Sequence, residues 1–442
     1  MRKLIIMASL LSLVGAHAMA QGKAIAFEQY KLDNGLQVIL HEDHTTPIVA
    51  VTVMYHVGSK NENPERTGFA HFFEHLLFEG SENIERGQYM KIIEAAGGAL
   101  NANTSNDRTF YYEILPSNQL ELGLYMESER LLHAKIDQVG VETQREVVKE
   151  EKRQRIDNQP YGSFAGETFK RAFKVHPYRW MPIGSMDHLN AATLEEFIEF
   201  YKTFYVPQNA ILSIAGDINV AETKKLVEKY FAEIPAGTRE IPRPNVVEPA
   251  QTEEIRDVVY DNIQLPAVFQ SYHMPAQGTD DYYALNMLTQ ILSAGKSSRL
   301  NKELTDNQQK ALQVFAFPYA LEDPGLFITL GIVNMGVKPE DLEAAMDVEI
   351  EKVKNELITE EEFQKIRNQV ENDFVSGNAT MAGIAESLAN YQMYFGDANL
   401  INTEIERYMK VTREDIKAVA NKYLNKENRV VLYYLPQSQK PE

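Results

Sequence analysis

A proline-rich break in the middle of the chain places the strongest constraint on its fold. Residues 235–249 contain four prolines and show neither helical nor strand periodicity. Such a stretch is typical of a linker. The break predicts a domain at residues 21–234 and a second domain at residues 255–442, joined by a linker at residues 235–254.

Strands and helices are predicted in a similar order on both sides of this break. The first side has predicted strands at 36–41, 48–57, 99–104, 108–115 and 210–215, and helices at 68–78, 89–96, 119–132, 141–156, 194–204 and 221–231. The second side has strands at 267–273, 312–317, 326–332 and 429–435, and a helix at 282–292. These assignments rest on apolar periodicity and turn residues. We expect two structurally related halves, with chance similarity of α/β patterns as the alternative.

The first twenty residues predict an export signal. Arg2 and Lys3 precede an apolar run from Leu4 to Val14, and Ala18-Met19-Ala20 fits the A-x-A pattern of a cleavage site. The run is too short to span a bilayer. We therefore expect removal of residues 1–20, a mature chain that starts near Gln21, export to the periplasm and no membrane anchor.

Composition excludes several classes of function. The chain has no cysteine, which rules out disulfides, thiolate metal sites and a cysteine nucleophile. Its formal charge of −19 repels the phosphate backbone, so no nucleic-acid partner is expected. An acidic surface favours cationic peptides, although acidic excess also serves solubility.

The segment His71-Phe72-Phe73-Glu74-His75 reads H-x-x-E-H. On a helix, residues four apart project from one face, so the two imidazoles lie together. Such a pair suits tetrahedral zinc, and an adjacent carboxylate can take a proton from metal-activated water. This order is the signature of inverted zincins. In a chain with ten histidines, a polar helix face that holds two of them by chance is the alternative.

A hydrolytic zinc site needs a third protein ligand. In the predicted helix 141–156, Val147 and Val148 mark the inward face, and Glu151 lies four and three residues after them. A carboxylate on a buried face is costly unless it is paired or bound to a metal. Glu151 is therefore favoured over Glu150, which points away. A fully solvated, charged helix is the alternative.

These segments together identify a family resemblance. The sequence resembles the M16 (pitrilysin/insulinase) metallopeptidases of the half-length M16B type over essentially the whole mature chain. The resemblance is carried by TGFAHFFEHLLFEGSENI at 67–84, LNANTSNDRTFYYE at 100–113, QREVVKEE at 144–151 and YVPQNAILSIAGDI at 205–218, with 75 residues between His75 and Glu151. It implies an α+β chain with two α/β-roll domains, each a mostly antiparallel sheet packed with helices, in the LuxS/MPP-like metallohydrolase fold.

The resemblance also implies an activity and roles for residues. It implies a zinc endopeptidase that hydrolyses peptides or small unfolded proteins, with one Zn²⁺ per chain. The implied zinc ligands are His71, His75 and Glu151, and Glu74 is the implied general base. Gln144 stands where the family commonly has a glutamate near the ligands, and it can form hydrogen bonds there but supplies no charge.

In the family, a strand edge beside the metal pairs with the substrate backbone. That role transfers to four consecutive residues, Asn101, Ala102, Asn103 and Thr104. An ordinary internal hairpin strand is the alternative. Pairing of this kind recognises the backbone, so it predicts little about cleavage preference.

The chain departs from the family pattern in its second half. Active members carry an arginine and a tyrosine seven residues apart, and Thr305 and Leu312 occupy these positions here. In the family, both residues contact substrate and the tyrosine helps to stabilise the oxyanion. Neither Thr305 nor Leu312 can donate a charge-assisted or phenolic hydrogen bond. Loss of an oxyanion donor lowers the rate by a factor on the order of 10² to 10³. Arg299 belongs to a different element of the pattern. We therefore expect a heterodimer with a related subunit that carries the Arg/Tyr pair. A non-catalytic scaffold subunit and a self-sufficient homodimeric peptidase are the alternatives.

Overall fold

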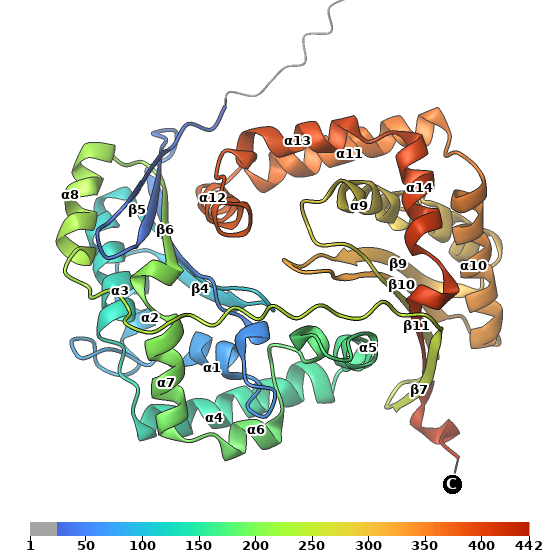
Figure 1. The fold of residues 1–442 in the computed structure, drawn as a ribbon, viewed down its shortest axis with the longest axis horizontal. Helices are drawn as coiled ribbons and strands as arrows, with labels where there is room; N and C mark the ends of the chain where they lie inside the picture. The colour runs from blue at the N-terminus through green and yellow to red at the C-terminus, as the bar shows by residue number, and fades with distance from the viewer. Residues whose placement is uncertain (1–23, 442) are drawn as a thin grey trace, which may run out of the picture.

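The structure is a computed structural model that describes residues 24–441 (Figure 1). The expected signal peptide, residues 1–20, lies outside the described residues. Within residues 24–441, no helix has both the length and the apolar character needed to cross a membrane.

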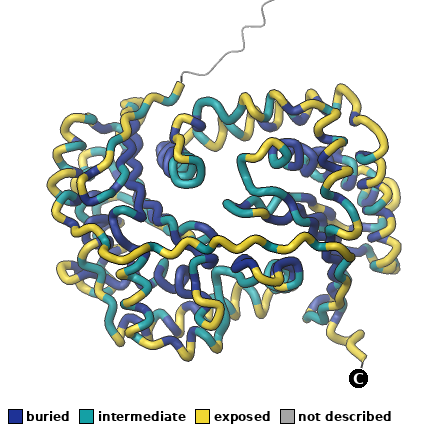
Figure 2. The backbone as a smooth tube through the Cα atoms, viewed as in Figure 1, coloured by how far each residue is buried: buried dark blue, intermediate teal, exposed yellow. Residues whose placement is uncertain are grey.

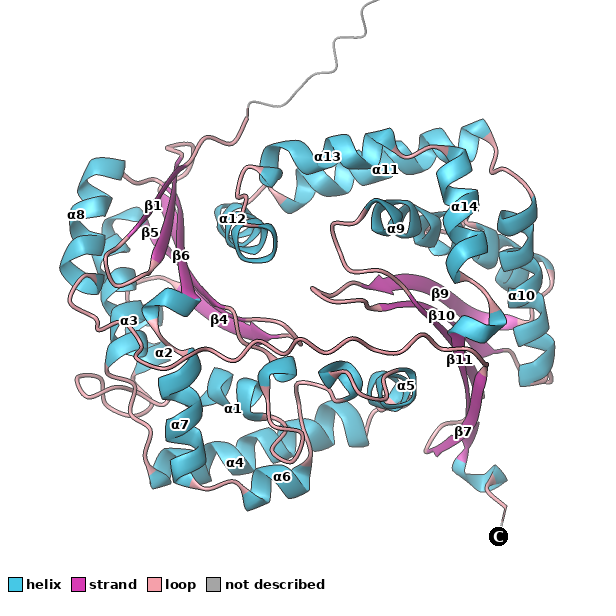
Figure 3. Ribbon diagram, viewed as in Figure 1, coloured by secondary structure: helices cyan, strands magenta, loops and turns pink. Residues whose placement is uncertain are grey.

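The first half contains one six-stranded sheet and its helices (Figure 3). Its strands are β1 (Glu28–Lys31), β2 (Gln37–Glu42), β3 (Ile48–Tyr55), β4 (Ala99–Thr104), β5 (Thr109–Pro116) and β6 (Ala210–Gly216). Its helices are α1 (Phe69–Leu76), α2 (Tyr89–Ala95), α3 (Leu120–Leu132), α4 (Gln138–Lys152), α5 (Phe164–Ala172), α6 (Met186–Ala191), α7 (Leu194–Phe204) and α8 (Val220–Phe231).

The second half contains a five-stranded sheet. Its strands are β7 (Ile255–Asp261), β8 (Ala267–His273), β9 (Ala311–Tyr319), β10 (Leu326–Val333) and β11 (Arg429–Pro436). Its helices are α9 (Asp280–Ser293), α10 (Pro339–Asn355), α11 (Glu360–Gly377), α12 (Met381–Phe395), α13 (Leu400–Lys410) and α14 (Arg413–Tyr423). The segment between α8 and β7 forms no helix or strand and runs, largely exposed, across one face of the molecule (Figure 2).

The two sheets repeat the same strand order. The order β2-β6-β3-β5-β4 in the first sheet matches β7-β11-β8-β10-β9 in the second, and β1 is an addition at the edge of the first. The first two neighbouring strands in each order, β2 with β6 and β7 with β11, run parallel. All later neighbours in the two orders run antiparallel. Because pairing and direction both match, the repeat predicted from element order reflects a common topology. The expected α+β class with two related, mostly antiparallel sheets is confirmed.

Each half supplies a helix to the other half's core. Helix α12 of the second half packs on β3 and β6 of the first sheet, where Leu388 and Ala389 join Met54 in one buried cluster. In Figure 1, α12 lies on the side of this sheet opposite α3 and α8. Conversely, α5 of the first half packs on β8 and β11, where Phe169 is buried with Phe269. The two halves therefore share two hydrophobic cores.

A buried ion cluster also joins the halves. Lys60, only 5% exposed, lies 3.1 Å from Asp107 Oδ1 within its own half. Its Nζ is also 2.5 Å from Glu322 Oε2 and 3.2 Å from Asp323 Oδ2, both on the β9–β10 connection. One ammonium group thus forms ion pairs with carboxylates from both halves.

Arg299, which the sequence pattern excludes from the site, forms an ion pair with Glu362. Its Nε and Nη2 each donate a 2.9 Å hydrogen bond to Glu362, at the start of α11. Its guanidinium therefore serves a structural contact, which agrees with the prediction that Arg299 is not a residue of the metal site.

The Arg299–Glu362 pair predicts an acid-dependent contribution to stability. Hydrogen bonds from Arg299 lower the pKa of Glu362 to about 2 from its ordinary 4.5. A depressed pKa in the folded state stabilises the fold above the ordinary pKa, and the contribution disappears as the pH falls from 4.5 toward 2. We expect E362Q to lower the free energy of unfolding by about 1 kcal/mol at neutral pH, because the pair is partly exposed. In urea unfolding, this difference from wild type should shrink below pH 4.5, whereas the exposed control E361Q should show none at any pH.

Candidate metal centre

Helix α1 begins where two glycines meet. Gly68, with φ of +100°, precedes the helix, and a Cβ on Gly184 would lie only 2.4 Å from the Gly68 Cα. The carboxylate of Glu62 accepts from the backbone N–H groups of Gly68 (2.9 Å) and Ala70 (2.8 Å). A carboxylate at this position satisfies N–H groups that the helix itself leaves unpaired. The start of α1 is therefore fixed by contacts distant from His71 and His75.

The other end of α1 is held by a buried arginine and a tyrosine. Arg130 of α3, 2% exposed, donates from Nη1 to the carbonyl of Leu77 at 2.9 Å. The Tyr111 hydroxyl donates to the carbonyl of Phe73 at 3.0 Å. No sequence pattern points to Glu62, Arg130 or Tyr111, because their partners are backbone atoms of another element.

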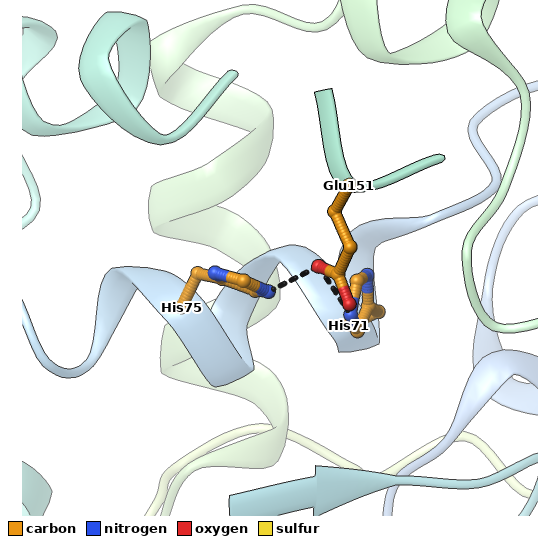
Figure 4. Close-up of side chains that lie close together, drawn as sticks. All are labelled: His71, His75 and Glu151. Atoms are coloured by element: carbon orange, nitrogen blue, oxygen red, sulfur yellow. Dashed lines mark ion pairs between the residues drawn. The ribbon is translucent and has the colours of Figure 1, made fainter. Parts of the chain in front are cut away.

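Three donor groups converge between α1 and α4. Figure 4 shows His71 and His75 of α1 and Glu151 of α4 pointing toward one another. Glu151 Oε2 lies 2.9 Å from His75 Nε2 and 3.5 Å from His71 Nε2. One ligand atom from each residue lies within 4.8 Å of the other two. The structure thus brings together the three residues predicted to hold the metal.

The spacing of these donors fits a zinc ion. Zinc–nitrogen and zinc–oxygen distances of about 2.0–2.2 Å place the donors of a tetrahedral site roughly 3.3 Å apart. The two measured separations of 2.9 and 3.5 Å lie on either side of that value. Glu151 Oε2 is buried, yet it accepts no well-aligned hydrogen bond from either ring. A cation between the three groups would satisfy this oxygen.

The protonation states also fit metal binding. Burial, followed by the neighbouring His75, lowers the pKa of His71 to about 4, so His71 is neutral at pH 7. The contact with His75 is the main cause that lowers the pKa of Glu151, which keeps its carboxylate charged. The other oxygen of Glu151 is 2.7 Å from Arg155 Nη1. A neutral imidazole and a carboxylate are the forms of these side chains that bind zinc.

Helix α4 corrects one sequence inference. Val148 is fully buried as expected, but Val147 is 44% exposed and does not lie on the inward face. The inward face instead runs through Val148 to Glu151, three residues apart. Glu151 therefore shares the inward face with Val148 and not with Val147.

Glu74 lies beside the three donors and reaches the edge of the first sheet. Its Oε2 accepts a 2.7 Å hydrogen bond from the Thr104 hydroxyl at the end of β4. Burial is the largest influence on the Glu74 carboxyl and raises its pKa, whereas the bond from Thr104 opposes that rise. Thr104 was predicted to contact substrate only through its backbone, so its bond to Glu74 is an additional contact.

Strand β4 has one unpaired edge. Among residues 24–441 it pairs only with β5, and it ends the first sheet. The backbone N–H of Ala102 bonds to the side chain of Asn101 (2.9 Å), which places this N–H on the edge away from β5. The Asn103 side chain accepts from Arg108 at 3.0 Å. The predicted residues Asn101 to Thr104 thus form an open strand edge that ends at Glu74.

Gln144 lies close to the centre but bonds elsewhere. Its Nε2 donates to Glu79 Oε1 at 2.5 Å, and Glu79 Oε2 is 2.7 Å from Arg86 Nε. Within residues 24–441, Gln144 forms no hydrogen bond to His71, His75 or Glu151. Its part in orienting the ligands stays a prediction.

The positions matched to the family's Arg/Tyr pair carry no usable donor toward a substrate. Thr305 lies in the π-helical turn Asn301–Asn307, where its hydroxyl oxygen is buried and unpaired. Leu312 lies on β9 and is 52% exposed.

Comparisons with known proteins place the chain in a family. Residues 37–177 match the family model described as insulinase (peptidase family M16), and residues 191–370 match the one described as peptidase M16 inactive domain. The zinc protease PqqE of Helicobacter pylori is 33% identical over 97% of both chains. An uncharacterized zinc protease of Mycobacterium leprae is 27% identical over 89% of this chain and 88% of that protein.

Solved structures agree with these matches. The crystal structure of a protease from Helicobacter pylori has a TM-score of 0.90 and 32% identity, and the match covers 94% of this chain and 100% of that one. The periplasmic protease PqqL of Escherichia coli, at 18% identity, shares the fold with a TM-score of 0.76 over 94% of this chain and 48% of its own. The chain is therefore a half-length member of the M16 peptidase family.

Proposed function

We propose that this chain is a zinc-dependent endopeptidase subunit. His71, His75 and Glu151 hold one zinc ion, and Glu74 is the general base. The convergence of three metal-binding donors with a partly desolvated carboxylate, next to an open strand edge, is the observation that carries the proposal. Export to the periplasm is part of the proposal and rests on residues 1–20.

When bound, zinc would act as a Lewis acid that acidifies water and polarises the scissile carbonyl. Glu74 then acts as the proton carrier. Thr104 occupies its Oε2, which leaves Oε1 to accept a proton from the attacking water and to deliver it to the leaving amine. The Thr104 hydroxyl keeps the carboxylate oriented during both transfers.

The substrate is an extended peptide that adds a strand beside β4. The Ala102 N–H on the outer edge would exchange its bond to Asn101 for a bond to a substrate carbonyl. Because this contact involves backbone atoms, unfolded segments of many sequences can bind. Folded proteins, which offer few free extended segments, are poor substrates.

A second, related subunit completes the site. Thr305 and Leu312 leave this chain without the arginine and tyrosine expected of active relatives. The two shared cores and the Lys60 cluster hold the halves together, so a separate chain is the better source of groups that approach the zinc from outside. Pairing with a related subunit that carries the Arg/Tyr pair provides those groups.

Recovery of the native assembly tests this proposal. We expect a complex of this chain with a related subunit to cleave an unstructured peptide, a chelator to abolish cleavage, and added zinc to restore it. The isolated chain should bind zinc but cleave at least about 10²-fold more slowly, as expected when an oxyanion donor is missing. An isolated chain as active as any complex would favour a homodimeric peptidase. A metal-free chain whose stability is unaffected by chelator would favour a scaffold.

A further inference from the structure

A cavity of about 480 Å³ opens between the halves next to the strand edge. Its first wall is the β4–β5 turn, which begins at Ser105, the residue after Thr104. Helices α9, α12 and α13, the segment before α9, and the end of β9 with the residues that follow it provide the remaining walls. A side chain of a peptide that continues along the β4 edge past Thr104 would lie next to this cavity.

Several aromatic side chains line the walls of the cavity. The rings that line the cavity are Tyr282, Tyr319, Tyr391, Tyr394 and Phe395. The faces of such rings attract cations through their quadrupoles, most strongly where water is excluded.

The cavity also contains a carboxylate that lacks a cation. Glu404 accepts hydrogen bonds from the hydroxyls of Tyr391 and Tyr283, the latter at 3.1 Å. Among the described residues, no lysine, arginine or histidine nitrogen lies within 4.0 Å of Glu404. The neighbouring Arg407 contacts the Tyr283 hydroxyl instead, at 3.4 Å. Two tyrosines thus hold a negative charge in place without neutralising it.

The other polar groups of the lining are consistent with a cationic ligand. Arg108 pairs with Glu386 at 2.6 Å, and Asp107 pairs with Lys60 at 3.1 Å, so each already has an ion-pair partner. The side-chain oxygen of Asn390, in contrast, is buried and has no hydrogen-bond partner. Glu404 and Asn390 therefore offer acceptors to a ligand.

We propose that this cavity is a subsite for an arginine side chain of the peptide substrate. The guanidinium carries several donors in one plane, so it can bond to Glu404 and Asn390 while stacking on the tyrosine rings. The net charge of −19 favours the approach of cationic peptides. This inference deepens the proposed function and rests on it.

Binding of paired peptides tests the subsite separately from catalysis. The peptides are labelled octamers of small residues in which one arginine occupies each position in turn, and matched peptides carry uncharged citrulline. The zinc-loaded E74Q chain, in which cleavage should be slowed by a factor of about 10² to 10⁴, is titrated into each labelled peptide, and binding is followed by fluorescence anisotropy. We expect arginine to be preferred by about tenfold at one position of the peptide.

Two substitutions locate the preference in the cavity. E404Q keeps the size of the side chain and its tyrosine bonds but removes the charge, so the arginine preference should fall to less than about twofold. E406Q, at an exposed glutamate on the same helix, should keep the preference. N390D adds a negative charge to the lining and should increase it. Circular dichroism checks that each variant is folded.

Equal binding of the arginine and citrulline peptides at every position would overturn the subsite. An arginine preference that E404Q and N390D both leave unchanged would also overturn it. Chelator-sensitive cleavage without any arginine preference would refute the subsite alone. An arginine preference in a chain that never cleaves peptides, even with its partner, would refute the proposed function and leave the cavity a peptide-binding site.

Discussion

Replacing Glu74 with glutamine is expected to leave zinc bound and to lower kcat by a factor of about 10² to 10⁴. Glutamine has nearly the shape of glutamate and can still accept the bond from Thr104, so His71 and His75 should keep their positions. What it cannot do is take a proton from water. The loss should therefore appear in turnover and leave metal binding intact.

Two measurements on one preparation check this expectation. Zinc per chain is measured by mass spectrometry, and kcat is measured on an unstructured peptide with the partner subunit present. E85Q, at an exposed position beyond the motif helix, is the control and should match wild type in both. An E74Q protein with the wild-type rate would exclude Glu74 as the base. Zinc lost together with activity would assign Glu74 a role in holding the metal.

Replacing Lys60 with methionine is expected to destabilise the fold by about 3–5 kcal/mol. Methionine fills much of the lysine volume but leaves Asp107, Glu322 and Asp323 facing one another without their shared cation. Removing one partner of a buried ion cluster is far more costly than removing a surface pair. The contact between the halves should weaken most.

Urea unfolding and limited proteolysis measure this effect. K60M should unfold at lower urea, and the segment between α8 and β7 should be cut faster than in wild type. K224M removes an exposed pair with Glu28 and should change the free energy of unfolding by no more than about 0.5 kcal/mol. A K60M protein that matched K224M in both assays would show that the cluster does not hold the halves together.

Much of the fold could be predicted because local patterns determine it. The hairpin strand at 99–104, the helix at 194–204 and the strand at 267–273 match the observed bounds. Strands β1 and β7 were missed because exposed, charged residues interrupt their alternation. The exchange of α5 and α12 between the halves could not be predicted, since it depends on which apolar faces meet in space.

The candidate site also has a part that the sequence predicts and a part that it does not. His71, His75 and Glu151 are recognisable because zinc ligands need fixed residue types at characteristic spacings. The contacts of Glu62, Arg130 and Thr104 join residues 8 to 53 positions apart and leave no periodic signal in the sequence. They orient α1 and Glu74, and only the packed structure reveals them.

Anomalous diffraction at the zinc absorption edge, from crystals of the chain grown without added metal, shows whether His71, His75 and Glu151 bind zinc. We expect one strong peak within bonding distance of His71 Nε2, His75 Nε2 and a carboxylate oxygen of Glu151, and no such peak in E151Q crystals. A wild-type chain without a peak between these three residues, or with its zinc bound elsewhere, would contradict this expectation.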